Sequence, residues 1–285
     1  MNEDISKEKN ILLTIAYDGT NFCGWQRQPG SRTVCGELEA VLTDLLKTPV
    51  KLNGTSRTDA GVHALGQRAS FKAVCPVPAE RLAKVINDRL AKDRLEGVGD
   101  IRILEAKEMP EDFHARFSSR GKRYVYRIYN SPERSIFIRD HFYQLSQPLD
   151  VSAMRKASAY IEGEHDFACF MSSGSTPQES TVRTVYRLRV QELSAPAALL
   201  PSGENMEEGR EVRIIIEGNG FLYNMVRIIT GTLVECGLGR RSPESVRDAI
   251  EKKDRSLAGH TAPPQGLYLA EVFYDRSTQN TPKGE

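Results

Sequence analysis

A short polar segment at residues 53–64 (NGTSRTDAGVHA) has the composition of a catalytic loop. It combines two glycines and several small hydroxyl residues with one acid, Asp59. Glycine lets a substrate backbone come close, and loops on a rigid scaffold often carry the reactive group. Asp59 is therefore a candidate catalytic carboxylate. The alternative is a tight turn in which Asp59 accepts hydrogen bonds from nearby amides.

Arg57 lies two residues before Asp59. An arginine within ~4–6 Å of a carboxylate keeps it ionised and lowers its pKa by ~1–3 units. An ionised, partly desolvated carboxylate is a usable nucleophile. The two residues then form one reactive pair. The alternative is a surface ion pair that contributes only ~0–1 kcal/mol to stability.

Residues 113–127 (FHARFSSRGKRYVYR) alternate cations with aromatic rings and contain no acid. RNA binding needs cations for the phosphates and flat rings for unstacked bases, so this pattern favours RNA. The alternative is a half-exposed strand whose rings face the core. The cations of the segment are Arg116, Arg120, Lys122, Arg123 and Arg127.

Two other segments each contain one residue that stands out from its surroundings. Arg227 lies within an apolar, helix-like run, where a buried arginine requires a partner, and we expect a carboxylate. The alternative is a helix-edge arginine whose head reaches water. Trp25, the only tryptophan, lies in the polar loop at residues 17–28. That loop either lines a cleft or packs over a sheet edge, and the sequence favours neither.

Hydrophobic periodicity predicts the elements that position these residues, in the order β-α-β-β-α-β twice over. In the first half we expect strands at residues 11–18, 50–53, 66–73 and 101–107, and helices at 33–47, capped by Thr33, and 78–91. In the second half we expect strands at 122–129, 182–193, 211–218 and 267–274, and helices at 151–161, 220–236, capped by Asn219, and 243–252.

This repeat predicts an α/β (α+β) fold of two ferredoxin-like halves whose sheets join edge to edge and leave a cleft. We place the halves at residues 1–110 and 111–276, followed by a disordered tail at 277–285. Residues 172–180 and 194–210 are rich in Ser, Pro, Gly and Glu, and we expect exposed loops there.

Composition excludes several classes of protein. The chain has 285 residues, 39% of them hydrophobic, which supports a buried core. It has no apolar run of ~20 residues and no signal-like start, so we expect a cytoplasmic protein without a membrane span. The five cysteines and five histidines form no metal-binding motif. Nucleotide-binding and redox motifs are absent, so we expect no cofactor. The net charge of +1 means that a basic RNA-binding surface must be local.

Taken together and in this order, the segments resemble the tRNA pseudouridine synthase A family. The resemblance covers nearly the whole chain and rests on residues 17–28, 56–63 (SRTDAGVH), 112–130, 219–231 and 265–270. It implies the pseudouridine synthase fold, in which two ferredoxin-like halves form a continuous sheet with a central active-site cleft. It also implies a homodimer that binds tRNA, and a cofactor-free isomerisation of uridine at positions 38–40 of the anticodon stem-loop.

The resemblance also assigns roles to residues. It places Asp59 at the catalytic aspartate and Tyr124 at the tyrosine that stacks on the target base. Arg57 and Arg227 correspond to arginines that flank the aspartate, of which one pairs with it and one holds the flipped nucleotide. From the basic segment we add a set of substrate-binding cations: Arg116, Lys122 and Arg123.

The chain departs from the family pattern at Ser56, where glycine is common, and at Ala91, where proline is frequent, with extra residues at 94–99. These changes affect loop shape rather than the reaction. Three rival functions remain open. One is a non-catalytic RNA-binding protein, which gives no reason for a negative charge at Asp59 beside phosphates. The others are a pseudouridine synthase for a different RNA, and a hydrolase that releases free uracil.

Overall fold

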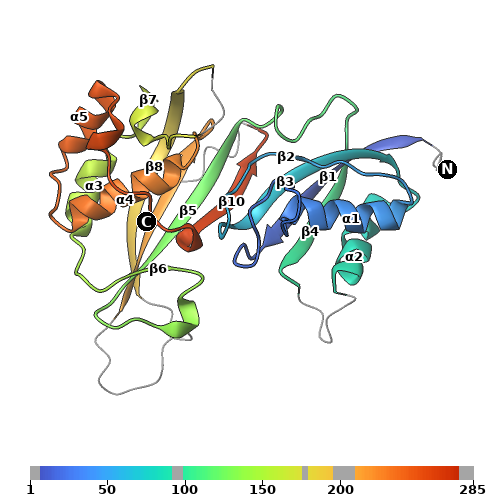
Figure 1. Cartoon of the computed structure of the whole chain (residues 1–285). Coiled ribbons are helices and arrows are strands. Elements are labelled where there is room, and N and C mark those ends of the chain that lie inside the picture. The colour runs from blue at the N-terminus through green and yellow to red at the C-terminus, as the bar shows by residue number, and fades with distance from the viewer. Residues whose placement is uncertain (1–6, 92–98, 175–178, 195–208, 276–285) are drawn as a thin grey trace. The chain divides into compact units, whose positions relative to one another are not determined.

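The computed structural model describes residues 7–91, 99–174, 179–194 and 209–275 (Figure 1). The described residues form five α-helices and ten strands, so the chain is a mixed α/β protein. It divides into two compact units, of which unit 1 is Met1–Arg120 with Leu269–Glu285 and unit 2 is Gly121–Tyr268. These units differ from the predicted halves at residues 111–120 and 269–276. Among the described residues, none of the helices has both the length and the apolar character needed to cross a bilayer.

Unit 1 is built around β1 (Glu8–Tyr17), which pairs antiparallel with both β3 (His63–Val74) and β4 (Ile101–Met109). The strand order is β4-β1-β3-β10, with β10 at Leu267–Phe273, and the short β2 (Asn53–Gly54) also pairs with β3. The helices α1 (Val34–Leu46) and α2 (Ala79–Leu90) lie on the same face of these strands (Figure 1). Their fully buried leucines, Leu38 and Leu82, contribute to the core of this unit.

Two predictions at the start and end of α1 have different outcomes. Thr33 is confirmed as the N-cap, because its side chain accepts a hydrogen bond from the Gly36 backbone N–H. The strand predicted at residues 50–53 is confirmed only at Asn53, where β2 begins. The backbone N–H of Val50 donates to Thr43, and that of Leu52 donates to Glu39, so these groups bond to side chains of α1 rather than to a strand.

Unit 2 has the strand order β5-β9-β8-β7, and all of these neighbours are antiparallel. The strands are β5 (Gly121–Asn130), β9 (Arg210–Gly218), β8 (Val182–Ser194) and β7 (Gly163–Asp166). A further strand, β6 (Tyr143–Leu145), runs parallel to β5. The sequence did not predict β6 and β7, because three or four residues are too few to show an alternating pattern. The helices are α3 (Val151–Ser158), α4 (Met225–Gly237) and α5 (Ser245–Lys252).

The predicted start of α4 is also wrong, because the helix begins at Met225 and not at residue 220. Asn219, the expected cap, instead bonds to β8: its backbone N–H donates to the Thr184 carbonyl, and its side chain accepts from the Thr184 N–H. Asn224 precedes the helix in the left-handed region, with φ of 60°. A residue in that conformation cannot continue a right-handed helix.

Several predicted features fall on residues that are only partly described. Parts of four predicted segments lie outside the described residues: 175–178 of one expected loop, 195–208 of the other, 94–98 of the extra residues and the whole tail at 277–285. The element borders beside them are described: β8 ends at Ser194 and β9 begins at Arg210.

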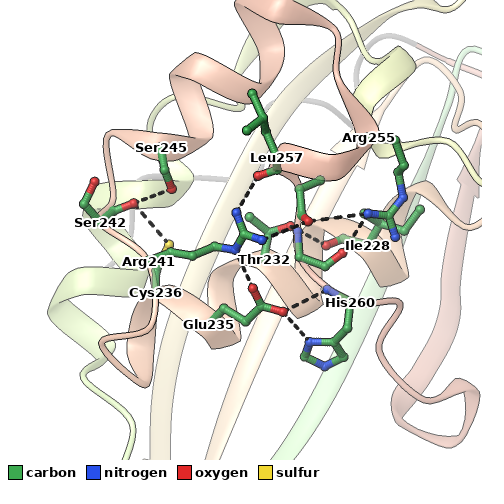
Figure 2. A network of polar contacts seen from close by, with 12 residues as sticks. Ile228, Thr232, Glu235, Cys236, Arg241, Ser242, Ser245, Arg255, Leu257 and His260 are labelled. Carbon is green, nitrogen blue, oxygen red and sulfur yellow. Dashed lines mark hydrogen bonds and ion pairs between the residues drawn. The ribbon is translucent and has the colours of Figure 1, made fainter.

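A network of polar contacts joins the C-terminal end of α4 to residues 255–260 (Figure 2). Glu235 accepts hydrogen bonds from the side chain of Arg241 and from both the backbone N–H and the Nδ1 of His260, the latter two at 2.9 Å. Arg241 also donates to the carbonyl of Leu257 at 2.6 Å. One turn earlier in α4, the Thr232 hydroxyl accepts from the Gly259 N–H at 2.8 Å. The network thus fixes residues 257–260 along the helix.

We predict that Glu235→Gln lowers the free energy of unfolding by about 1–3 kcal/mol at pH 7, because bonds to a charged acceptor are lost. Burial alone would raise the pKa of Glu235, but the hydrogen bonds from Arg241 and His260 outweigh it and hold the pKa at about 2. A carboxyl group whose pKa is lower in the folded than in the unfolded chain stabilises the fold at pH values above its unfolded pKa of ~4.3. This contribution is lost as the pH falls towards 2.

Urea denaturation at several pH values tests this prediction. The difference between the native protein and Glu235→Gln should shrink as the pH falls below ~4. Glu251→Gln, at an exposed glutamate of α5, is the matched control and should change little at any pH. A difference for Glu235→Gln that is the same at pH 7 and at low pH would contradict the role given to its charge.

Candidate active site

The loop that carries Asp59 leaves β2 and returns as β3, and its first residues are fixed to β3. The backbone N–H of Thr55 donates to the Arg68 carbonyl at 2.8 Å. The side chain of Gln67, which is fully buried, donates to the Ser56 carbonyl at 2.7 Å and accepts from the Ser56 N–H at 3.3 Å. A side-chain amide thus takes the place of a paired strand at the start of the loop.

The residue before Asp59 is held by a second segment, residues 17–25. The hydroxyls of Tyr17 and Thr58 are 2.6 Å apart, and the backbone N–H of Trp25 donates to the Thr58 carbonyl at 3.0 Å. Gly24 has a φ of +90°, and a Cβ added there would lie 2.7 Å from the Thr58 carbonyl oxygen. Glycine is therefore required at this position. Both the backbone and the side chain of Thr58 are fixed, which sets the position of the Asp59 Cα.

Trp25, the residue that stands out in the 17–28 loop, packs against the sheet. Its side chain is only 2% exposed. A Cβ added at Gly54 would lie 2.3 Å from its Nε1, so the indole rests directly on the backbone of β2. The Tyr17 ring lies 6.1 Å from Trp25 between centroids. The tryptophan packs over the strand that leads into the Asp59 loop.

The end of the Asp59 loop is held by the same 17–25 segment. The Gly19 N–H donates to Nδ1 of the buried His63 at 3.1 Å, and a carboxylate oxygen of Asp18 lies 3.2 Å from that nitrogen. Asp18 and His63 are residue types that bind metals, but the backbone donor occupies the Nδ1 lone pair. A Cβ added at Gly19 would lie 2.1 Å from the Val62 carbonyl oxygen, so the two segments touch backbone to backbone.

Asp59 itself is partly exposed, and Arg57 is exposed. The Asp59 carbonyl accepts from the Val62 N–H at 3.2 Å, which closes a turn after the acid. Arg116 lies on the neighbouring loop at residues 110–120, and its side chain is exposed. The hydroxyl of Thr55 donates to the Ala115 carbonyl at 3.0 Å, so the two loops are bonded to each other. Unit 1 therefore brings these three predicted site residues together on two linked loops.

The other predicted site residues belong to unit 2. Tyr124 lies on β5, is 8% exposed, and has the Phe221 ring edge-on at 5.3 Å. Lys122 has the same strand parity and is half-buried. Arg123 points to the opposite face of β5, where its Nε donates to the buried Glu217 at 2.8 Å. An acid from β9 thus neutralises one of the cations counted in the basic segment.

Arg227 lies in the first turn of α4 and is half-buried. Its Nε donates to the Ala262 carbonyl at 2.7 Å, and its Nη1 donates to the Asn224 side chain at 2.8 Å. The Asn224 side chain in turn donates to Ser172 at 3.1 Å. These contacts orient the guanidinium, and the expected carboxylate partner stays a prediction. Beside this site, burial raises the pKa of Tyr126 well above its usual range, so its hydroxyl stays neutral.

Sequence reasoning missed the residues that orient the reactive ones. Thr58, Asn224 and the Ala262 carbonyl carry no chemistry of their own, and each acts through a neighbour. The available signal was weak: Asn224 precedes Arg227 by three residues, and asparagine tolerates the left-handed conformation that ends a turn. Within unit 1 the loop supplies a carboxylate at a fixed backbone position, and a carboxylate is a group that can serve as nucleophile or general base.

Comparison with known proteins gives concordant results. The family model described as tRNA pseudouridine synthase matches residues 13–118 and 157–275. The chain is 43% identical over 268 residues to a protein of Geobacillus sp. (strain WCH70) named tRNA pseudouridine synthase A, a match that covers 94% of this chain and 99% of that protein. It is 41% identical over 266 residues to the protein of that name from Ruminiclostridium cellulolyticum, covering 93% and 100%. It is 40% identical over 269 residues to tRNA pseudouridine synthase A 2 of Clostridium tetani, covering 94% and 99%.

The bond between Tyr17 and Thr58 can be tested by a double-mutant cycle. We predict that Tyr17→Phe and Thr58→Val each lower the free energy of unfolding by about 1–2 kcal/mol, since each leaves a buried hydroxyl without its partner. The double variant should lose about 1 kcal/mol less than the sum of the two. Urea denaturation of the four proteins measures this coupling. If the two losses were strictly additive, the hydroxyls would not interact. Tyr223→Phe, at an exposed tyrosine, is the control and should leave the free energy of unfolding unchanged.

Proposed function

The chain belongs to the tRNA pseudouridine synthase family, and from this premise we propose that it converts uridine to pseudouridine at positions 38–40 of the tRNA anticodon stem-loop. The observation that carries the proposal is the Asp59 loop. It is fixed on both sides of the acid through Thr58 and His63, while the acid itself stays partly exposed. A non-catalytic RNA-binding protein gains nothing from a negative charge at this position beside phosphates.

The proposed reaction is an isomerisation that needs no cofactor. The uridine leaves the base stack at a cost of about a few kcal/mol, which contacts with the protein offset. The N1–C1′ bond breaks, the uracil turns, and the C5–C1′ bond forms. The proton lost from C5 is balanced by the proton gained at N1. Reactant and product have the same atoms and oxidation state, so the reaction consumes no nucleotide and no reductant.

We assign the chemical step to Asp59. It acts at one of three points, by attack on C6 of the uracil, by attack on C1′ of the ribose, or by removal of the C2′ proton, and each route breaks the glycosidic bond. Tyr124 stacks on the target base and is our candidate acceptor of the C5 proton, directly or through water. Arg57 and Arg227 divide two tasks, to pair with the carboxylate and to hold the flipped nucleotide.

Binding of the rest of the tRNA is assigned to cations on both units. Arg116 is exposed and Lys122 is half-buried, and we assign both to contacts with phosphates. Arg123 has a weaker claim, because its guanidinium already pairs with Glu217. We further propose that the fold consists of two ferredoxin-like halves. We propose that the protein forms a homodimer that binds tRNA across both subunits, and that it acts on tRNA in the cytoplasm. The antiparallel strand orders β4-β1-β3-β2 in unit 1 and β5-β9-β8 in unit 2 support the proposed halves.

Tritium release from an unmodified tRNA transcript labelled at C5 of uridine tests the reaction. We predict release to water by the native protein in the presence of a chelator, and none by Asp59→Asn, because an amide neither attacks carbon nor removes a proton. The tRNA affinity of Asp59→Asn should stay within about several-fold of native, since the substitution removes no contact to phosphate.

Asp88→Asn, at an exposed aspartate of α2, is the matched control and should release tritium at the native rate. If Asp59→Asn loses tRNA binding together with turnover, Asp59 is structural rather than catalytic. Formation of free uracil identifies the hydrolase, and release with a modified site outside 38–40 assigns a different RNA position. No release by the native protein from a tRNA that it binds rejects the reaction.

Arg227 offers a separate test, because Ala262 and Asn224 orient its guanidinium. We predict that Arg227→Ala lowers turnover by at least ~100-fold, since the charge is lost at a fixed position. Arg227→Lys should recover little, because a single ammonium nitrogen does not reproduce the planar fork whose Nε and Nη1 donate to Ala262 and Asn224. Single-turnover kinetics with saturating protein separates this loss from weaker binding. Near-native turnover of Arg227→Ala would remove this residue from the site.

A further inference from the structure

Phe117 is 78% exposed, more than any other large apolar side chain among the described residues. It lies on the 110–120 loop, one residue after Arg116 and within unit 1. A single exposed apolar residue is common on protein surfaces. What distinguishes Phe117 is that its neighbours hold the ring in the exposed position.

The turn at residues 114–118 is held by its own hydrogen bonds. Nδ1 of His114 accepts from the backbone N–H groups of Arg116 and Phe117, at 3.1 and 3.4 Å. The Ser118 N–H donates to the His114 carbonyl at 2.9 Å, and the Ser118 hydroxyl accepts from the His114 N–H at 3.1 Å. The imidazole ring then lies 4.4 Å from the Phe117 ring at an interplanar angle of 39°. The phenyl ring therefore rests against a second ring instead of entering the core.

The same turn is anchored to the loop that carries Asp59. Ala115, at its centre, is fully buried, and its N–H donates to the Ser70 hydroxyl of β3 at 3.2 Å. Its carbonyl accepts from the hydroxyls of Thr55 and Tyr274, each at 3.0 Å. Thr55 begins the Asp59 loop. The position of Phe117 relative to that loop is therefore fixed through Ala115, and a ligand that contacts Phe117 is held at a fixed position relative to the loop.

The charges around the ring favour RNA over a protein partner. The Arg116 guanidinium lies 5.8 Å from the centre of the Phe117 ring and is exposed. A base that stacks on the phenyl ring brings its phosphate close to such a cation, which is the usual arrangement for single-stranded nucleic acid. An apolar protein surface that covered the ring would also strip water from the guanidinium without pairing it.

We propose that Phe117, supported by His114, stacks on an unpaired base of the substrate RNA other than the uridine that reacts, and that Arg116 binds the adjoining phosphate. The proposal rests on the proposed function, because it takes the substrate to be a folded RNA with unpaired bases. Phe117 is then a positioning residue. It holds the RNA through the 110–120 loop and takes no part in the chemical step.

The test replaces Phe117 by residues that distinguish the effect of a flat aromatic ring from that of an apolar side chain. Phe117→Ala should raise the KM for tRNA, and the Kd, by roughly 5- to 150-fold, from ~1–3 kcal/mol per stacked base. The kcat should stay within about two-fold, because stacking away from the reacting base is the same in ground and transition states. Phe117→Tyr and Phe117→Trp should stay near native. Phe117→Leu should resemble alanine, since it keeps apolar area without a flat face.

A matched control and two further readouts complete the design. Phe137, which is 68% exposed on the turn Ile136–Ile138 of unit 2, gives the control Phe137→Ala, with native KM expected. The fluorescence of Phe117→Trp should be quenched when tRNA is added, and that of Phe137→Trp should not. Arg116→Ala should reduce the salt dependence of tRNA binding by about one unit of slope, whereas Phe117→Ala should leave the slope unchanged.

Three results would overturn the proposal. A native KM and Kd for Phe117→Ala would show that the ring does not touch RNA, and native behaviour of Phe117→Leu would show that it binds without stacking. A lower oligomeric mass of Phe117→Ala in light scattering, with native tRNA affinity, would assign the ring to a contact with a second copy of the chain. The binding and fluorescence arms need no turnover. Failure of tritium release by the native protein therefore rejects the proposed reaction and leaves this test intact.

Discussion

The candidate site depends on one close contact, in which residues 17–25 lie directly against the backbone of the Asp59 loop. The contact is possible only where side chains are missing, since a Cβ at Gly19, Gly24 or Gly54 would lie within 2.1–2.7 Å of an atom of the opposing segment. It replaces the missing strand pairing of a loop with hydrogen bonds to Thr58 and His63. An acid at such a position keeps its geometry without being buried, which is the combination that a catalytic carboxylate requires.

The sequence predicts the long strands and helices well, and it fails where side chains replace regular backbone pairing, while the reactive residues stay predictions. The long strands and the helix capped by Thr33 follow from periodicity and capping, which are local properties of the chain. The strand predicted at residues 50–53 begins only at Asn53, because the N–H groups of Val50 and Leu52 donate to the side chains of Thr43 and Glu39. The start of α4 was predicted too early because Asn219 bonds to Thr184. These partners lie in other elements, so the periodicity of a segment does not reveal them.

Asp59 in unit 1 and Arg227 in unit 2 are held in position by different kinds of contact. In unit 1 Asp59 is placed by its backbone, because Thr58 before it and His63 after it are bonded to residues 17–25. In unit 2 the Arg227 guanidinium is placed by direct hydrogen bonds to Ala262 and Asn224. A short carboxylate has few rotamers and needs only a fixed backbone, whereas a long arginine loses more rotamer freedom and needs contacts along its head group.

Residues 255–262 are bonded to both ends of α4. Arg227, in the first turn of the helix, donates to the Ala262 carbonyl, and Glu235, in its last turn, accepts from the His260 N–H (Figure 2). The fit is also steric, because a Cβ at Gly231 would lie 1.9 Å from the His260 carbonyl oxygen. Helix and segment therefore form a single exchangeable module. A substitution on either side of this contact alters the surface on which the other side packs, so the orientation of Arg227 depends on both the helix and the segment. Transfer between relatives should succeed only when both pieces travel together.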